Sequence, residues 1–132
     1  SNHGEMFAID TKNGSILWKQ VIFNHNKIFI KNNNLFFVND EDYFIILNKL
    51  DGRILFKKNL NTVFDKADRK LNFLNIVFDK QFINIIFENK IIKINSKNLN
   101  DVSINRKKLN IIKYYIKGSN IFLLTENKLL KL

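Results

Sequence analysis

Residues 6–19 read MFAIDTKNGSILWK and contain two short apolar segments on either side of a polar turn. The first segment ends at Asp10, the turn contains Asn13-Gly14, and the second segment ends at Trp18, the only tryptophan. Asn and Gly both tolerate the positive φ of a tight turn, so this pair between apolar segments is a strong hairpin signal. The stretch therefore predicts two antiparallel strands.

Residues 45–57 repeat this pattern 38 positions later and without a gap. Every apolar position of the first stretch is also apolar in the second. The other aligned pairs are Asp10 with Asn48, Gly14 with Gly52, Trp18 with Phe56 and Lys19 with Lys57. An internal repeat predicts that similar structural units follow one another along the chain.

Two further motifs recur around these hairpins. One is a β-rich segment that begins at Asn24, Asn72 and Asn110 and continues through a polar turn into another strand. The other joins two apolar segments across a polar turn, as at residues 88–90 and 126–128. The wider spacing between the first two copies fits a longer loop around residues 62–70. Each unit is therefore predicted to contain four short strands.

Turn-linked strands with a period near 40 residues are typical of propeller blades, which have about four strands each. The sequence thus predicts an all-β fold, a partial β-propeller of four-stranded antiparallel blades. We expect full blades at residues 23–58 and 71–106. Residues 5–20 would supply the last two strands of one incomplete blade, and residues 109–132 the first three strands of another. A helix over residues 70–86 is disfavoured, because the segment is rich in Phe, Ile, Val and Asn.

The composition of the 132-residue chain suits one domain or part of one, since 45% of its residues are hydrophobic. No apolar run approaches the roughly 18 residues that a membrane-spanning helix needs. The chain has no cysteine, which excludes disulfides, thiolate chemistry and metal sites built from cysteine.

The net charge of +10 raises the alternative of a nucleic-acid-binding module. Lysines and aromatic residues interleave in residues 27–31 and 113–117, as they do on surfaces that stack single-stranded bases. Strands that alternate a buried and a solvated face explain the same pattern. Lys also accompanies an excess of Asn, Ile and Phe, all of which have A/T-rich codons, so genome composition is favoured over a dedicated anion-binding face as the source of the charge. Nucleic acid is therefore the less favoured partner.

The segment Phe7–Trp18 resembles the repeat of pyrroloquinoline-quinone-type (PQQ-like) β-propellers. That repeat has apolar-Ala-apolar-Asp, three variable residues, Gly, and Trp shortly afterwards. Residues 46–56 keep the Gly and the apolar pattern but have Asn and Phe in place of Asp and Trp, and residues 95–99 keep the turn without the Gly. The structural markers of the repeat in this chain are Asp10, Gly14, Trp18, Asn48, Gly52 and Phe56.

These markers are expected to have structural roles. Gly14 and Gly52 supply the left-handed turn conformation. Asp10 is able to accept hydrogen bonds from the backbone N–H groups of its turn. Trp18 suits a position between neighbouring sheets with its N–H bonded, and the resemblance implies that it docks on the next blade. Phe56 keeps the apolar bulk without the donor.

The sequence shows no catalytic, cofactor-binding or metal-binding residues. The cofactor-using members of the family imply a quinone and a calcium-like ion held by Glu, Asn and Asp, often near a disulfide of adjacent cysteines, and no such set is found here. Residues 39–42, NDED, form the one acidic cluster but lack the Gly and distal Glu of a calcium loop, so we expect a solvated turn. His3 and His25 have no partner at ligand or nucleophile–base spacing.

The resemblance implies a function without an enzyme activity or a small-molecule substrate. The cofactor-free branch of the family includes the propeller lipoprotein of the outer-membrane β-barrel assembly machinery. A likeness to that protein implies a scaffold for protein–protein interaction, in the periplasm or at the outer membrane, with the barrel-insertion subunit as partner. An N-terminal propeller half, preceding Ser1, would supply the remaining blades. The other alternative is part of a quinoprotein dehydrogenase.

Overall fold

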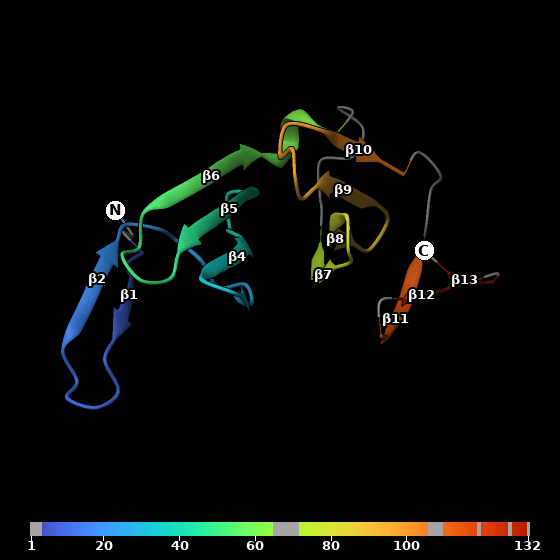
Figure 1. The fold of residues 1–132 in the computed structure, drawn as a ribbon. Helices are drawn as coiled ribbons and strands as arrows, with labels where there is room; N and C mark the ends of the chain where they lie inside the picture. Colours follow the sequence, from blue (N-terminus) through green and yellow to red (C-terminus); the bar gives the residue numbers. More distant parts are fainter. Residues whose placement is uncertain (1–3, 65–71, 106–109, 119, 127, 132) are drawn as a thin grey trace. The chain divides into compact units, whose positions relative to one another are not determined.

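The computed structural model describes residues 4–64, 72–105, 110–118, 120–126 and 128–131. These residues form thirteen short strands in four antiparallel sheets (Figure 1). Two sheets have four strands, one has three and one has two, which confirms the predicted all-β partial propeller with two full and two incomplete blades. The chain divides into two compact units, Ser1–Ala67 and Asp68–Leu132.

The first unit contains a hairpin and a four-stranded sheet. The hairpin pairs β1 (Met6–Ile9) with β2 (Ile16–Gln20). The sheet has its strands in chain order, which are β3 (Phe29–Lys31), β4 (Asn34–Val38), β5 (Tyr43–Asn48) and β6 (Ile54–Asn59). Each antiparallel neighbour is reached by a tight turn, so polar turns between apolar segments are sufficient to build the sheet.

The core of the first unit lies between the hairpin and this sheet. Met6 and Ala8 pack inward from β1, whereas Phe7 and Ile9 point to the opposite face and are about half exposed, as the period of two in a strand requires. The buried residues of this core are Trp18, Ile22, Leu35, Phe37, Ile45 and Leu47. The hairpin therefore covers one face of the four-stranded sheet.

The second unit contains a four-stranded and a three-stranded sheet, both in chain order. The strands are β7 (Phe73–Phe78), β8 (Phe82–Phe87), β9 (Ile91–Asn95), β10 (Val102–Ile104), β11 (Ile111–Lys117), β12 (Asn120–Thr125) and β13 (Leu129–Lys131). The two sheets share a core, and the Ile111 N–H donates a 2.8 Å hydrogen bond to the Glu88 carbonyl. The members of this core are Val77, Ile86, Ile91, Ile111, Ile121 and Leu123.

Residues 73–87 form β7 and β8, so strands are confirmed there in place of a helix. The only helical segment among the described residues is η1 (Leu60–Thr62), capped by the Asn59 side chain, which accepts a hydrogen bond from the Asn61 N–H. The blade boundaries at 71, 106, 109 and 132 and most of the loop predicted at 62–70 lie outside the described residues and stay predictions.

The alternation of buried and solvated faces expected in residues 27–31 and 113–117 holds only in part. These segments contribute to β3 and β11, the first strands of their sheets, which have a neighbouring strand on one side only. In β11 the pairing register also shifts between Ile111 and Lys113. The exposed apolar and aromatic side chains in or beside these segments are Ile28, Ile30, Ile112, Tyr115 and Ile116.

Candidate functional site

The turn of the β1–β2 hairpin is held by backbone and side-chain hydrogen bonds. Gly14 has φ of 74°, and its N–H donates to the Asp10 carbonyl at 2.7 Å. The Asp10 N–H donates to the Ser15 carbonyl at 2.8 Å, and the Asp10 carboxylate accepts from the Lys12 N–H at 2.8 Å. The Asn13 side chain accepts from the Ser15 N–H. The polar residues of the motif therefore bond to their own turn.

The β5–β6 turn repeats this arrangement 38 residues later. Gly52 has φ of 71°, and its N–H donates to the Asn48 carbonyl at 2.9 Å. The Asn48 N–H donates to the Arg53 carbonyl, and the Asn48 side chain accepts from the Leu50 N–H at 2.8 Å. The Asp51 side chain accepts from the Arg53 N–H. Asn48 performs the role of Asp10 with a neutral amide, so this bond needs an oxygen acceptor and not a charge.

Both hairpins also have an irregularity at the same place in their second strand. In the first, Ala8 pairs with Trp18 but Ile9 pairs with Ile16, which leaves Leu17 as the extra residue. In the second, the equivalent shift leaves Leu55 as the extra residue. A bulge of this kind bends the strand and redirects its side chains. The two corners are therefore alike in backbone as well as in sequence.

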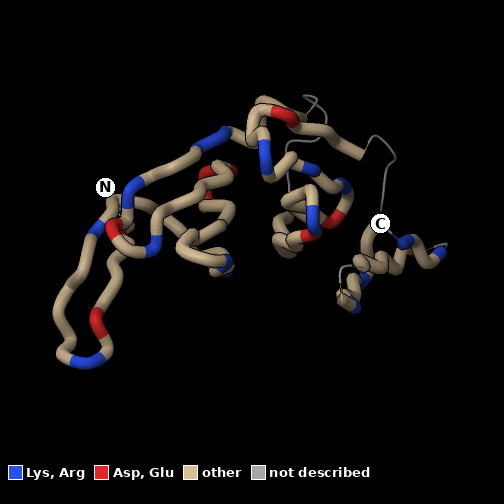
Figure 2. Tube along the Cα trace, in the orientation of Figure 1, with Lys and Arg blue, Asp and Glu red and all other residues tan. Residues whose placement is uncertain are grey.

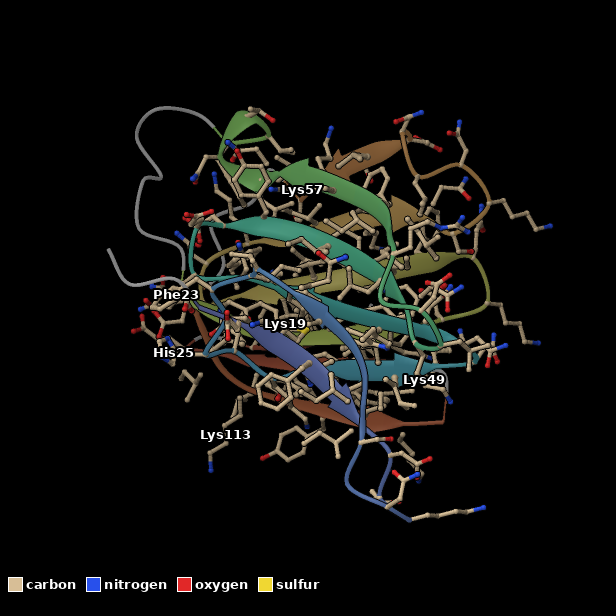
Figure 3. The ribbon with its side chains drawn as sticks, turned by 90° about the vertical axis from the view of Figure 1, so that its left-hand side faces the viewer. Lys19, Phe23, His25, Lys49, Lys57 and Lys113 are labelled. Carbon is tan, nitrogen blue, oxygen red and sulfur yellow. The ribbon has the colours of Figure 1, made fainter. Side chains whose placement is uncertain are left out.

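Trp18 joins the hairpin to the four-stranded sheet. Its side chain is 9% exposed, and its indole N–H donates to the Lys49 carbonyl at 2.8 Å. A Cβ atom on Gly52 would lie 2.5 Å from the indole, so this position requires glycine for close approach as well as for its positive φ. Lys49, which is labelled in Figure 3, lies in the β5–β6 turn.

Gln20 is a second contact at this corner that sequence reasoning missed. Its side-chain N–H donates to the Gly52 carbonyl at 2.8 Å. Gln20 is two residues after Trp18 in β2, so both side chains leave the strand on the same face. The spacing of two residues between Trp18 and Gln20 was the signal in the sequence from which this contact could have been predicted. Phe56, which aligns with Trp18, is partly buried and makes an edge-to-face contact with Phe44, with ring centroids 6.1 Å apart.

The acidic cluster at residues 39–42 is a tight turn with internal partners. Asn39 is buried, and its side chain accepts from the N–H groups of Tyr43 and Glu41. Asp42 has φ of 61°. Asp40 accepts from the His25 N–H and lies 2.8 Å from the His25 Nδ1. Asp40 and Glu41 are exposed, as expected for a solvated turn, and the Asn39 side chain bonds within the turn.

The prediction that His25 has no partner is wrong. The loop before β3 returns beside the β4–β5 turn and brings His25 to Asp40, 15 positions away in the chain. The Phe23 ring contacts the His25 ring edge to face at 4.8 Å, and the two are adjacent in Figure 3. The His25 side chain is largely exposed, so this pair ties a loop to a turn at the surface. His3 lies outside the described residues.

A partly buried polar network that sequence reasoning did not anticipate lies at the β7–β8 turn, where Asn84 is buried and Asp79 is partly exposed. The Asp79 carboxylate accepts from the Gln81 and Phe82 N–H groups and from the side-chain amide of Asn84. Desolvation by burial raises the pKa of Asp79, but the Asn84 amide, the two backbone N–H groups and the nearby Lys93 together hold that pKa below its ordinary value of 3.8. The ionised carboxylate therefore stabilises this turn.

Positive charge is distributed over the described parts of both units, with no single continuous run (Figure 2). Some lysines lie over aromatic rings of the chain itself. The Lys57 ammonium is 4.5 Å from the Tyr43 ring centroid, and Lys93 is 5.6 Å from that of Phe82. Among the described residues, no group of three or more His, Asp or Glu is placed to hold a metal ion. No helix in the described part of the chain is long and apolar enough to cross a membrane.

No protein-family model matches this sequence, and no curated protein matches it. The fold does have a likeness among solved structures. The structure of BamB from Moraxella catarrhalis superposes with a TM-score of 0.68 at 10% sequence identity, covering 97% of this chain and 38% of that one. The chain thus spans less than half the length of that protein. The likeness shows that this chain has the fold of part of a BamB-type β-propeller.

Proposed function

We propose that this chain is part of a non-catalytic β-propeller that acts as a scaffold for protein–protein interaction. The observation that carries the proposal is that the repeat markers are used to hold turns and sheets together. The Asp10 and Asn48 side chains bond to their own turns, and the Trp18 N–H bonds to the Lys49 carbonyl. Side chains that make these hydrogen bonds stabilise the fold, and this supports a scaffold over an enzyme.

Exposed apolar side chains offer surface to a protein partner. Contiguous apolar surface on a folded protein is a common mark of an interaction site. In the first unit such side chains gather on the hairpin and beside it, and include Phe7, Ile9, Ile16, Leu17 and Val21. Phe7 and Ile9 lie on the opposite face of the hairpin from Met6 and Ala8, which pack into the core.

The proposal extends to the assembly of outer-membrane β-barrel proteins. The partner is then the barrel-insertion subunit, and the location is the periplasm or the periplasmic face of the outer membrane. Two observations support this step. The repeat resembles that of PQQ-like propellers, whose cofactor-free branch includes the outer-membrane assembly propeller lipoprotein, and the fold is like that of BamB.

Site-specific crosslinking in the native host tests this proposal. A photo-crosslinking residue replaces Leu50 or Asn98, which are exposed turn positions in two different sheets, in the full-length protein. We expect crosslinked adducts that contain the barrel-insertion subunit, identified by mass spectrometry, and no adduct without irradiation. Recovery of the protein in the cytoplasmic fraction, or adducts that never contain an envelope protein, would refute the assembly role.

The nucleic-acid alternative is tested by the salt dependence of oligonucleotide binding. Contacts to phosphates weaken steeply as salt rises, because bound counterions are released. The scaffold proposal expects no saturable binding at physiological salt. Tight, salt-dependent binding would support the alternative.

A further inference from the structure

Asn13-Gly14 in the β1–β2 turn is the only Asn-Gly dipeptide in the chain, and Asp51-Gly52 in the β5–β6 turn occupies the same two repeat positions 38 residues later. We propose that the β1–β2 turn is a site of spontaneous deamidation, at which Asn13 and Gly14 close to a succinimide, and that contacts protect the β5–β6 turn from the corresponding reaction. The modification needs water and no enzyme, and it is independent of the scaffold role.

The reaction joins the Gly14 backbone nitrogen to the Asn13 side-chain carbon, Cγ. The nitrogen attacks Cγ and gives up its proton, the side-chain amide leaves with that proton as ammonia, and a succinimide ring forms. Water then opens the ring at either carbonyl. The product is aspartate at position 13 or isoaspartate, in which the main chain passes through the side-chain carbon. Glycine favours the attack because it has no Cβ to obstruct the approaching group.

The β1–β2 turn has the reacting groups in place and open space around them. Asn13 is exposed, and its side-chain oxygen accepts a 2.9 Å hydrogen bond from the Ser15 N–H. That donor stabilises negative charge on the oxygen as the ring closes. Apart from its two chain neighbours, no heavy atom of the described chain lies within 4 Å of the place where a Gly14 Cβ would be. Ring closure breaks the Gly14 N–H bond to the Asp10 carbonyl, at an exposed turn where water is at hand to replace it.

The β5–β6 turn has the same backbone bonds, but the hairpin holds it in place. Gly52 is buried, and the Trp18 indole lies 2.5 Å from the place where its Cβ would be. The Gln20 side chain donates to the Gly52 carbonyl at 2.8 Å. Ring closure turns the peptide group between residues 51 and 52, so it has to displace these groups first. Asp51 also carries a carboxylate, which is a poorer electrophile than a carboxamide. Contacts and residue type therefore both protect this turn.

A turn in the second unit shows the same protection by contacts with an asparagine in place. Asn95-Ser96 is the only Asn-Ser dipeptide in the chain, and serine is small enough to permit ring closure. The N–H and the hydroxyl of Ser96 both donate to the Gln81 carbonyl at 2.9 Å, and the Asn95 side-chain amide donates to the Asp101 carboxylate at 3.2 Å. The nucleophile and the leaving group are both held, so we expect little reaction at this turn.

Deamidation changes the shape and the charge of the β1–β2 turn. Isoaspartate lengthens the main chain, so the Gly14 bond to the Asp10 carbonyl and the Asp10 N–H bond to the Ser15 carbonyl cannot both keep their geometry. Either product also adds a negative charge to the turn that contains the Asp10 carboxylate. Trp18 lies further along β2 and keeps its bond to the Lys49 carbonyl. The turn therefore loosens while the hairpin stays packed on its sheet.

Ageing of the purified 132-residue chain tests the site. The folded protein is incubated at physiological temperature and pH and then digested at acidic pH. Mass spectrometry detects the conversion of an amide to an acid in each peptide, and methylation by an isoaspartate methyltransferase detects isoaspartate. We expect the peptide that contains position 13 to be converted to a mixture of isoaspartate and aspartate, and the peptides that contain positions 51 and 95 to stay unmodified.

The matched variant is Asp51→Asn, which places the same dipeptide in both turns and so isolates the effect of the contacts. The carboxamide oxygen is still able to accept the Arg53 N–H that bonds Asp51. In the folded variant, position 51 should deamidate about tenfold more slowly than position 13, because opening its turn breaks hydrogen bonds that the other turn lacks. In urea, the two positions should react at similar rates.

Three results would overturn the proposal: position 13 unmodified in the folded chain although it reacts in urea, aspartate without isoaspartate, which indicates direct hydrolysis, or equal rates at positions 13 and 51 in the folded Asp51→Asn variant. None of them alters the crosslinks expected from positions 50 and 98, so the deamidation site and the scaffold role stand or fall separately.

Discussion

Gly52 meets two demands at one position in the β5–β6 turn. Its φ of 71° is a conformation that residues with a Cβ adopt at a cost, and the Trp18 indole lies where a Cβ would be. Gly14 has the same conformation with open space beside it. The pair therefore separates the energy of backbone strain from that of close packing.

Replacing these glycines by alanine should have unequal effects. Gly14→Ala should lower the free energy of unfolding by about 1 kcal/mol through backbone strain alone. Gly52→Ala should lower it by about 3 kcal/mol, because the methyl group also overpacks against Trp18. Urea unfolding followed by circular dichroism measures both values. Equal losses would show that the indole moves away at little cost.

The indole hydrogen bond is tested by Trp18→Phe. Phenylalanine retains most of the apolar bulk but leaves the Lys49 carbonyl without its donor, so we expect a loss of about 1–2 kcal/mol. Trp18→Ala should cost about 3–5 kcal/mol, since a buried cavity forms as well. Thermal unfolding followed by circular dichroism suits both variants, which lack the only tryptophan. If Trp18→Phe lowered the stability as much as Trp18→Ala, the separation of the hydrogen-bond contribution from the packing contribution would be contradicted.

Asp79 makes the stability of the second unit depend on pH in the acidic range. Because its folded pKa lies below the ordinary value of 3.8, its contribution to stability is present above pH 3.8 and is lost as the pH falls through the folded pKa. Asp79→Asn should remove this part of the pH dependence of stability below pH 3.8. Near neutral pH, the plot of unfolding midpoint against pH should run parallel to that of the wild type. Unfolding midpoints measured across acidic pH check this, and an unchanged acid profile would refute it.

At the scale of elements, the presence of a neighbouring sheet decides how much a residue at a given repeat position contributes to the free energy of unfolding. Leu47 of β5 and Ile9 of β1 occupy equivalent positions, but the hairpin covers Leu47 while Ile9 lies on the outer face of that hairpin. Strand periodicity places both side chains on one type of face, and burial then depends on the neighbouring sheet.

Truncation of these two residues should show the difference. Leu47→Ala leaves a cavity in a closed core and should cost about 2–5 kcal/mol. Ile9→Ala removes a half-exposed side chain and should cost about 0.5 kcal/mol. The measurement is denaturant unfolding of each variant of the 132-residue chain. A large loss in Ile9→Ala would mean that the outer face of the hairpin is already covered in this chain.

At the scale of the whole molecule, the chain corresponds to 38% of the length of BamB and carries a net charge of +10. Its described lysines and arginines are dispersed over the sheets (Figure 2). Lys27, Lys57 and Lys93 lie over the chain's own aromatic rings. Dispersed charge favours solubility and does not by itself form a recognition site.

Reconstitution with pyrroloquinoline quinone distinguishes the scaffold from a quinoprotein dehydrogenase. The full-length protein is incubated with the quinone and Ca²⁺ and then dialysed. The scaffold proposal expects no quinone absorbance to remain with the protein and no dye-linked oxidation of alcohols or sugars. Stoichiometric retention of the quinone together with this oxidation activity would refute the scaffold proposal and support a quinoprotein dehydrogenase.

Local signals in the sequence were sufficient for the strands and turns. Asn13-Gly14 and the repeat at Gly52 predicted tight turns with positive φ, because that conformation depends on the residue type at the turn itself. Apolar alternation and a period near 40 residues predicted sheets of about four strands. The degenerate copy at Asn95, without a glycine, still bonds its turn through the Asn95 side chain to the Lys97 N–H.

Contacts between distant residues required the folded chain. The Trp18 N–H meets a carbonyl 31 positions away, Gln20 meets one 32 positions away, and His25 meets Asp40 across 15 positions. No local preference specifies such partners, because they depend on how one sheet stacks on the next and where each loop returns. The same stacking buries Leu47 and leaves Ile9 half exposed, although their sequence positions are equivalent. Residue type and periodicity thus specified the repeated unit, whereas packing between sheets assigned each copy its partners.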